Sequence, residues 1–109
     1  MEIKKITKQS QAIKMEAEEK GQVVGRAYLY LIYNGLHSEP YGLLEDVFVD
    51  DNYRGQGTGT RLVQKVIEEA KAAGCYKLIA CSRNSRPQIH EWYKKLGFED
   101  YGKEFKMEF

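Results

Sequence analysis

The stretch Tyr-Arg-Gly-Gln-Gly-Thr-Gly-Thr at positions 53–60 decides the fold of this chain. It follows an apolar, strand-like run from Leu43 to Val49, and it leads into a run from Leu62 to Ala73 whose apolar residues recur at helical spacing. Three glycines at alternate positions leave the backbone bare where this helix is expected to begin. Helix N-termini bind anions through their unpaired N–H groups, so the stretch predicts a cradle for a pyrophosphate.

Further strands and one more helix are expected around this unit. Ala12 to Glu18 alternates weakly, and the turn residues Lys20-Gly21-Gln22 join it to an apolar run, Val23 to Tyr33, which predicts an antiparallel hairpin. The second half of the chain predicts a buried strand over Lys77 to Cys81 and a closing strand or hairpin over Glu99 to Phe109. Between them a helix is expected, with Ser85 and Gln88 in capping-box spacing and Pro87 in its first turn, and it should end at Gly97.

Length and composition set looser bounds. The 109 residues suit a single domain spanning the whole chain. Seventeen Lys and Arg balance sixteen Asp and Glu, which argues against nucleic acid or an anionic membrane as partner. No apolar run is long enough to span a bilayer and the first residues lack a signal peptide's apolar stretch, so we expect a cytoplasmic protein.

The two cysteines do not indicate a metal or redox site. Cys75 and Cys81 lie six apart with no His nearby, a spacing that fits neither a zinc site nor a redox pair. We expect reduced thiols, with Cys81 packed in a buried strand, and no metal.

Glycine-rich loops occur in several settings. The three glycines could simply form a tight turn between strand and helix. A Rossmann loop needs Gly-x-Gly-x-x-Gly, and Thr60 stands where its third glycine belongs. A Walker P-loop needs Gly-Lys-Ser/Thr, which the chain lacks.

Three segments together resemble the GNAT superfamily of acetyl-coenzyme A dependent N-acetyltransferases. They are Arg54-x-x-Gly57-x-Gly59, the strand Leu44-Glu45-Asp46-Val47-Phe48-Val49, and the late helix Ile89-x-x-Trp92-Tyr93-x-x-x-Gly97-Phe98. The resemblance implies an α/β fold: a mixed twisted sheet with an N-terminal antiparallel hairpin, a central β-α-β crossover and a late helix. It also implies direct transfer of acetyl from acetyl-coenzyme A to a primary amine.

The same resemblance assigns the cofactor contacts. Backbone amides of the glycine loop would hold the pyrophosphate and the preceding strand would splay at a bulge to hold the pantetheine arm through Val47 and Val49. Phe48 is expected to point into the core while its backbone touches the cofactor. The loop residues so assigned are Arg54, Gly55, Gln56, Gly57, Thr58, Gly59 and Thr60, joined by Asn84 after the following strand.

Two residues are candidates for proton transfer. Glu45 and Asp46 interrupt an apolar strand, and burying an unpaired carboxylate is costly, so we expect one of them to face a cleft. Glu45 is the candidate base because it matches the glutamate of diamine and spermidine acetyltransferases, although it could instead bind a loop or a lysine; Asp46, on the opposite strand face, is expected to be structural. Tyr93 occupies the family's tyrosine position, where its hydroxyl would protonate the leaving thiolate, and its ring is expected to pack.

The N-terminal region departs from the family pattern. Relatives place a strand and two helices before the hairpin, whereas about twenty residues with no strong helical period precede Gly21 here. The acceptor site is then either open, which suits a bulky acceptor such as a protein lysine, or completed by a second protomer in a homodimer. Acidic residues near the strand favour a cationic amine as acceptor. The alternative to an enzyme is a module that senses acetyl-coenzyme A and acts through a protein partner.

Overall fold

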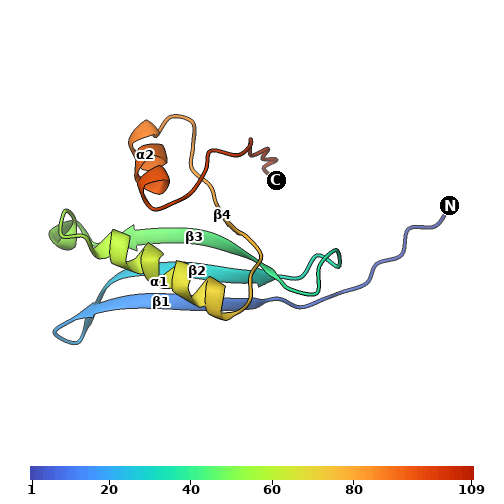
Figure 1. Ribbon diagram of the computed structural model, residues 1–109, viewed down its shortest axis with the longest axis horizontal. Helices are drawn as coiled ribbons and strands as arrows, with labels where there is room; N and C mark the ends of the chain where they lie inside the picture. The colour runs from blue at the N-terminus through green and yellow to red at the C-terminus, as the bar shows by residue number, and fades with distance from the viewer.

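A mixed sheet of four strands, ordered β1-β2-β3-β4, forms the body of the molecule in the computed structural model, which describes all 109 residues (Figure 1). Along the chain the elements are β1 (Gln11–Glu19), β2 (Gln22–Ile32), β3 (Tyr41–Val49), the short 3₁₀ helix η1 (Asp51–Tyr53), α1 (Thr58–Ala72), β4 (Leu78–Ala80) and α2 (Pro87–Lys95). This architecture confirms the predicted mixed sheet with an N-terminal hairpin and a central β-α-β crossover. Neither helix has the length and apolar character that crossing a bilayer requires.

The hairpin of β1 and β2 forms at the predicted turn. The two strands pair antiparallel, and Lys20 and Gly21 both adopt positive φ, at 50° and 78°. Two consecutive residues in this conformation twist a two-residue turn to match its flanking strands. The turn therefore fixes which residues of the two strands face each other.

The core lies between one face of the sheet and α1, which crosses that face in Figure 1. Alternate residues of β2 point toward the helix, and Leu29 among them is completely buried. The helix contributes residues at helical spacing, and Val63 and Val66 are also completely buried. The central cluster consists of Ala27, Leu29, Leu31, Leu44, Leu62, Val63, Val66 and Ala70.

The strands β3 and β4 run parallel but pair over a short distance. Gly42 to Leu44 face Leu78 to Ala80, after which β4 ends while β3 continues to Val49. Within that continuation β3 bulges: Glu45 still faces Tyr28, but Phe48 faces Arg26, so β3 has one residue more than β2 in this interval. The backbone of Asp46 is left-handed at this point, with φ 55°. The bulge and the end of β4 together separate the two strands.

Two of the expected local structures do not form. Residues 99–109 are exposed and carry no regular structure, so the predicted closing strand is wrong. Alternating apolar residues form a strand only against a partner, and no strand pairs with this segment. The capping box is also absent, because α2 begins after Arg86 with no side chain capping its first turn.

Candidate active site

A cleft of about 440 Å³ occupies the place where β3 and β4 separate. One wall is the bulged part of β3, the opposite wall is the segment after β4, and α2 closes one side. The lining residues are Leu44, Glu45, Asp46 and Val47 of β3, Cys81, Ser82, Arg83 and Arg86 after β4, Ile89, Trp92 and Tyr93 of α2, and Glu104. The cleft therefore brings together the two residues predicted to transfer protons, Glu45 and Tyr93.

Tyr93 is positioned by its aromatic neighbours. Its ring stacks on Trp92 with centroids 5.2 Å apart and meets Phe98 edge-on at 5.3 Å. Partial burial raises the pKa of its hydroxyl above the ordinary value, and the neighbouring Cys81 and Glu45 act in the same direction. The hydroxyl is therefore protonated at neutral pH, as a proton donor must be.

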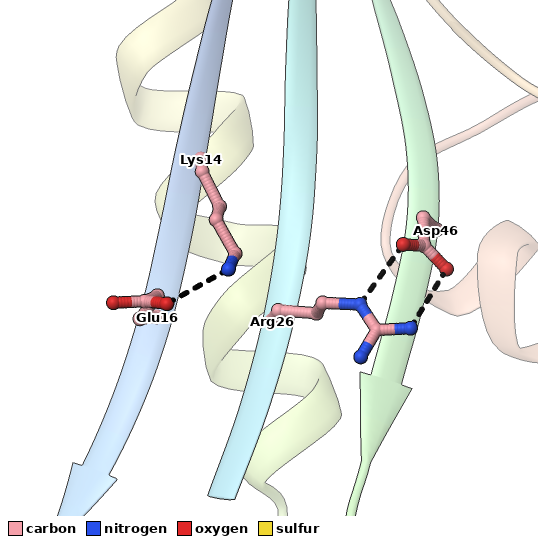
Figure 2. A network of polar contacts seen from close by, with 4 residues as sticks. All are labelled: Lys14, Glu16, Arg26 and Asp46. Atoms are coloured by element: carbon pink, nitrogen blue, oxygen red, sulfur yellow. Dashed lines mark hydrogen bonds and ion pairs between the residues drawn. The ribbon is translucent and has the colours of Figure 1, made fainter. Parts of the chain in front are cut away.

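The two carboxylates of the bulge have different environments. Asp46 binds Arg26, whose Nε donates to Oδ2 at 2.9 Å and whose second guanidinium nitrogen donates to Oδ1 at 3.3 Å (Figure 2). This hydrogen bond lowers the pKa of Asp46. Glu45 makes no ion pair in the structure. Asp46 thus fastens the bulge to β2, as its predicted structural role requires, while the carboxylate of Glu45 is unengaged.

The bulge also changes which way the β3 side chains point. Strand alternation predicts Glu45 and Asp46 on opposite faces, yet both line the cleft because Asp46 is left-handed. Beyond the bulge, Val47 and Val49 pack against the core and Val47 reaches the cleft. Phe48 is 38% exposed and lies against Arg26, so its predicted place in the core is wrong. The extra residue in β3 moves Phe48 to the outer face.

The glycine loop presents a row of unused donors. Gly55 and Gly57 are left-handed, with φ of 79° and 82°, and Gly57 caps α1 without any side-chain bond. No backbone N–H from Gly55 to Thr60 has an acceptor within the protein. Such successive amides at a helix N-terminus form a concave site for an anion. The expected position of the pyrophosphate cradle thus has the donors that it needs.

Arg54 is held beside this loop by the end of β3. Its Nε donates to the carbonyl of Val49 at 2.8 Å, and its guanidinium pairs with Asp51 at 2.9 Å. More than half of the side chain is exposed. Its charge is therefore fixed near the glycine loop and accessible from solvent.

Trp92 connects the loop to the cleft. Its indole N–H donates to the hydroxyl of Thr60 at 3.0 Å, and its ring also lines the cleft. A methyl group placed on Gly59 would lie 3.7 Å from the same ring. The first turn of α1 and the helix that carries Tyr93 are thus joined through one side chain.

Arg83, Arg86 and Glu104 line the cleft and were not predicted as site residues, whereas the predicted Asn84 does not line it. The place of Arg83 and Arg86 directly after β4 is the one signal that could have identified these two arginines. Cys81 is exposed in the cleft rather than packed in a strand, because β4 ends at Ala80. Partial burial of its thiol, together with Glu104, raises its pKa to about 11.

Comparison with known proteins relates this arrangement to acetyltransferases. A family model described as the acetyltransferase (GNAT) family matches residues 3–98. The glucosamine 6-phosphate N-acetyltransferase of Trypanosoma brucei brucei is 34% identical over 81% of this chain and 58% of its own length. The thialysine N-epsilon-acetyltransferase of Mus musculus is 34% identical over 84% of this chain and 54% of its own length.

A crystal structure of a Trypanosoma brucei acetyltransferase shares the fold, with a TM-score of 0.78 and 29% identity over 90% of this chain and 69% of that one. The chain spans 33% to 58% of the length of the first three glucosamine 6-phosphate N-acetyltransferases that it matches.

Proposed function

The chain belongs to the GNAT family of acetyltransferases, and we propose on this premise that it transfers the acetyl group of acetyl-coenzyme A directly to a primary amine. One observation carries the proposal: the cleft between the separated strands holds Glu45 and Tyr93 together. A proton acceptor and a protonated donor on one cleft are what aminolysis of a thioester requires.

The fold offers acetyl-coenzyme A a continuous path. The unused amides of Gly55 to Thr60 would bind the pyrophosphate, with the charge of Arg54 beside them. Beyond Leu44 the edge of β3 that faces the cleft has no partner strand, so its backbone groups can bind the amides of the pantetheine arm as a sheet edge binds a peptide. This path would bring the thioester to the part of the cleft lined by Tyr93.

The proposed reaction needs three proton transfers. Glu45, directly or through a water molecule, takes a proton from the acceptor ammonium, and the resulting neutral amine attacks the thioester carbonyl. As the new C–N bond forms, the nitrogen loses its second proton through water to solvent, and Glu45 and Tyr93 afterwards regain their starting protonation states by exchange with solvent. The C–S bond then breaks, and the hydroxyl of Tyr93 donates its proton to the departing sulfur. The raised pKa of Tyr93 supports this role, because the hydroxyl stays protonated until the thiolate forms.

The acceptor is proposed to be a small cationic amine. Relatives are named for glucosamine 6-phosphate and for thialysine, and both carry a primary amine. Arg83 and Arg86 also line the cleft, which supports an acceptor that carries an acidic group as well as an amine. A protein lysine is the second candidate for the acceptor, and we also propose that a second protomer contributes to the acceptor side of the cleft. The mass in solution would test for that protomer.

Calorimetric titration with acetyl-coenzyme A, followed by release of free thiol in the presence of amines, tests the proposal. The panel contains glucosamine 6-phosphate, thialysine and a lysine peptide. We expect saturable binding and thiol release that depends on the amine. Binding without release with any amine would instead support the sensing module, and absence of binding would overturn the role of the glycine loop.

A further inference from the structure

The C-terminal segment after α2 contributes one side chain, Glu104, to the lining of the cleft. Resting on the proposed N-acetyltransferase function, we propose that Glu104 binds the ammonium group of the incoming acceptor and that Glu45 then takes its proton. No motif pointed to Glu104, which lies far along the chain from the other carboxylates of the cleft.

Glu104 lies near the place where the proton transfers are proposed to occur. Glu104, Cys81 and Glu45 line the same cleft. Partial burial raises the pKa of Cys81, and the carboxylates of Glu104 and Glu45 act in the same direction. Partial burial also raises the pKa of Tyr93, and Cys81 and Glu45 add to that shift. All four side chains line this one cleft, with a carboxylate contributed from each of two distant segments.

Two carboxylates of the cleft have no cationic partner within the protein. Asp46 is neutralised by Arg26, whereas neither Glu45 nor Glu104 makes an ion pair. Arg83 and Arg86 line the cleft without pairing to either of them. A cationic amine in the cleft would be attracted by the carboxylates of both Glu104 and Glu45. An anionic group on the same acceptor could bind Arg83 or Arg86.

The two glutamates are given different tasks, and kinetics separate them. Binding of the ammonium by Glu104 contributes to the affinity for the acceptor, whereas proton removal by Glu45 contributes to turnover. We expect Glu104→Gln to raise the KM for thialysine or glucosamine 6-phosphate roughly two- to fivefold, the range for a partly screened charge pair, with kcat nearly unchanged. Glu45→Gln should lower kcat instead.

A matched control lies in the same segment. Glu108 is exposed, pairs with Lys106 and does not line the cleft, so Glu108→Gln removes an equal charge without touching the site. The wild type, Glu104→Gln and Glu108→Gln are compared by thiol release at low and high salt, by calorimetry with coenzyme A and by thermal melting. High salt screens the attraction between Glu104 and the acceptor ammonium, so it should raise the KM of the wild type toward that of Glu104→Gln. The KM of Glu104→Gln should change less, because this variant has already lost that attraction. Coenzyme A affinity and melting temperature should be the same in all three.

The outcomes separate the two proposals. An active wild type whose KM for the acceptor is unchanged by Glu104→Gln, or changed equally by Glu108→Gln, overturns this inference and leaves the proposed function standing. A fall in kcat at constant KM also overturns it, because Glu104 would then act in the chemistry. A wild type that binds acetyl-coenzyme A without releasing thiol to any amine refutes the proposed function, and this inference with it.

Discussion

Asp46 combines a demanding backbone with a useful side chain. Its φ of 55° lies in a region that asparagine and aspartate tolerate better than other residues with a side chain. Its carboxylate binds Arg26 on the neighbouring strand, as Figure 2 shows, and so holds the extra residue of β3 in place. One residue thus stabilises the distortion from which the cleft begins.

Asp46→Asn removes the charge while keeping a residue that suits the left-handed backbone. The pKa of Asp46 is lowered in the folded protein, so its contribution to the free energy of unfolding is present above the ordinary aspartate pKa and is lost as the pH falls through the folded value. We expect Asp46→Asn to melt below the wild type at neutral pH, and we expect this difference to shrink at acidic pH, as the pH falls through the lowered pKa of Asp46. Circular dichroism at both pH values measures this. A difference that persists at the acidic pH would show that the charge is not its cause.

Tyr93→Phe isolates the hydroxyl from the ring. The ring contacts with Trp92 and Phe98 remain, so folding and acetyl-coenzyme A affinity should be preserved. Loss of a general acid commonly costs 10²-fold or more, and we expect kcat to fall by about 100-fold. Stopped-flow thiol release measures kcat, and calorimetry checks binding. Unchanged turnover would exclude Tyr93 as the proton donor.

At the scale of elements, the glycine loop and the hairpin turn offer a controlled comparison. Gly57 and Gly21 are both left-handed, with φ of 82° and 78°, and a Cβ at either position would meet no atom within 4 Å. Alanine at either should destabilise the fold by a similar amount, about 1 kcal/mol, through backbone strain alone. Only Gly57→Ala should also weaken binding of acetyl-coenzyme A, because only this glycine belongs to the row of unused amides.

Denaturant unfolding and calorimetry on the two variants make the comparison. Equal losses of cofactor affinity would mean that the strain, rather than the loop, controls binding. If neither variant lost affinity, the loop would not be the anion site.

The local elements were predictable because their signals lie close together in the chain. The glycine spacing, the apolar period after Leu62 and the turn at Gly21 each depend on neighbouring residues, and these predictions are confirmed. The bulge at Asp46 was expected only through the family resemblance. An extra residue in β3 is defined by its pairing with β2, which the local sequence of β3 does not show. The alternation over residues 99–109 has no partner strand, so the local pattern misled there.

The candidate site was predictable for the residues that share a motif and not for those assembled by the fold. Glu45 and Tyr93 belong to recognisable segments, and the structure brings both to the cleft. Arg83, Arg86 and Glu104 reach the cleft through the end of β4 and the path of the C-terminal segment. Apart from the place of Arg83 and Arg86 after β4, these residues have no local sequence signal.

At the scale of the whole molecule, the two halves of the proposed site differ in how firmly they are held. Strand β2 and α1 supply most of the buried cluster, while α2 has no fully buried residue and lies beside the edge of the sheet, away from the hairpin (Figure 1). Partly buried residues of the α2 region, among them Trp92, Leu96 and Phe98, attach it to that cluster. A ligand that spans the glycine loop and the cleft would add contacts to both halves.

Coenzyme A should therefore raise the thermal stability markedly. A ligand present at a hundred times its Kd adds about 2.7 kcal/mol to the free energy of unfolding. For a domain of this size such a gain corresponds to a rise in melting temperature on the order of 10 °C. Differential scanning fluorimetry with increasing coenzyme A measures the shift. A shift that is absent in the wild type, or equally large in Gly57→Ala, would contradict binding at the loop.

The early end of the pairing between β3 and β4 has a further consequence. The cleft begins where the backbone ladder stops at Leu44 and Ala80, so its position is set by the pairing of the main chains. Most of its walls are side chains from segments with no ladder to maintain, such as Arg83, Arg86 and Glu104. In such a scaffold, substitutions of these side chains can change the preferred acceptor and leave the strand pairing intact. New specificities can then evolve through single substitutions, each of which still folds.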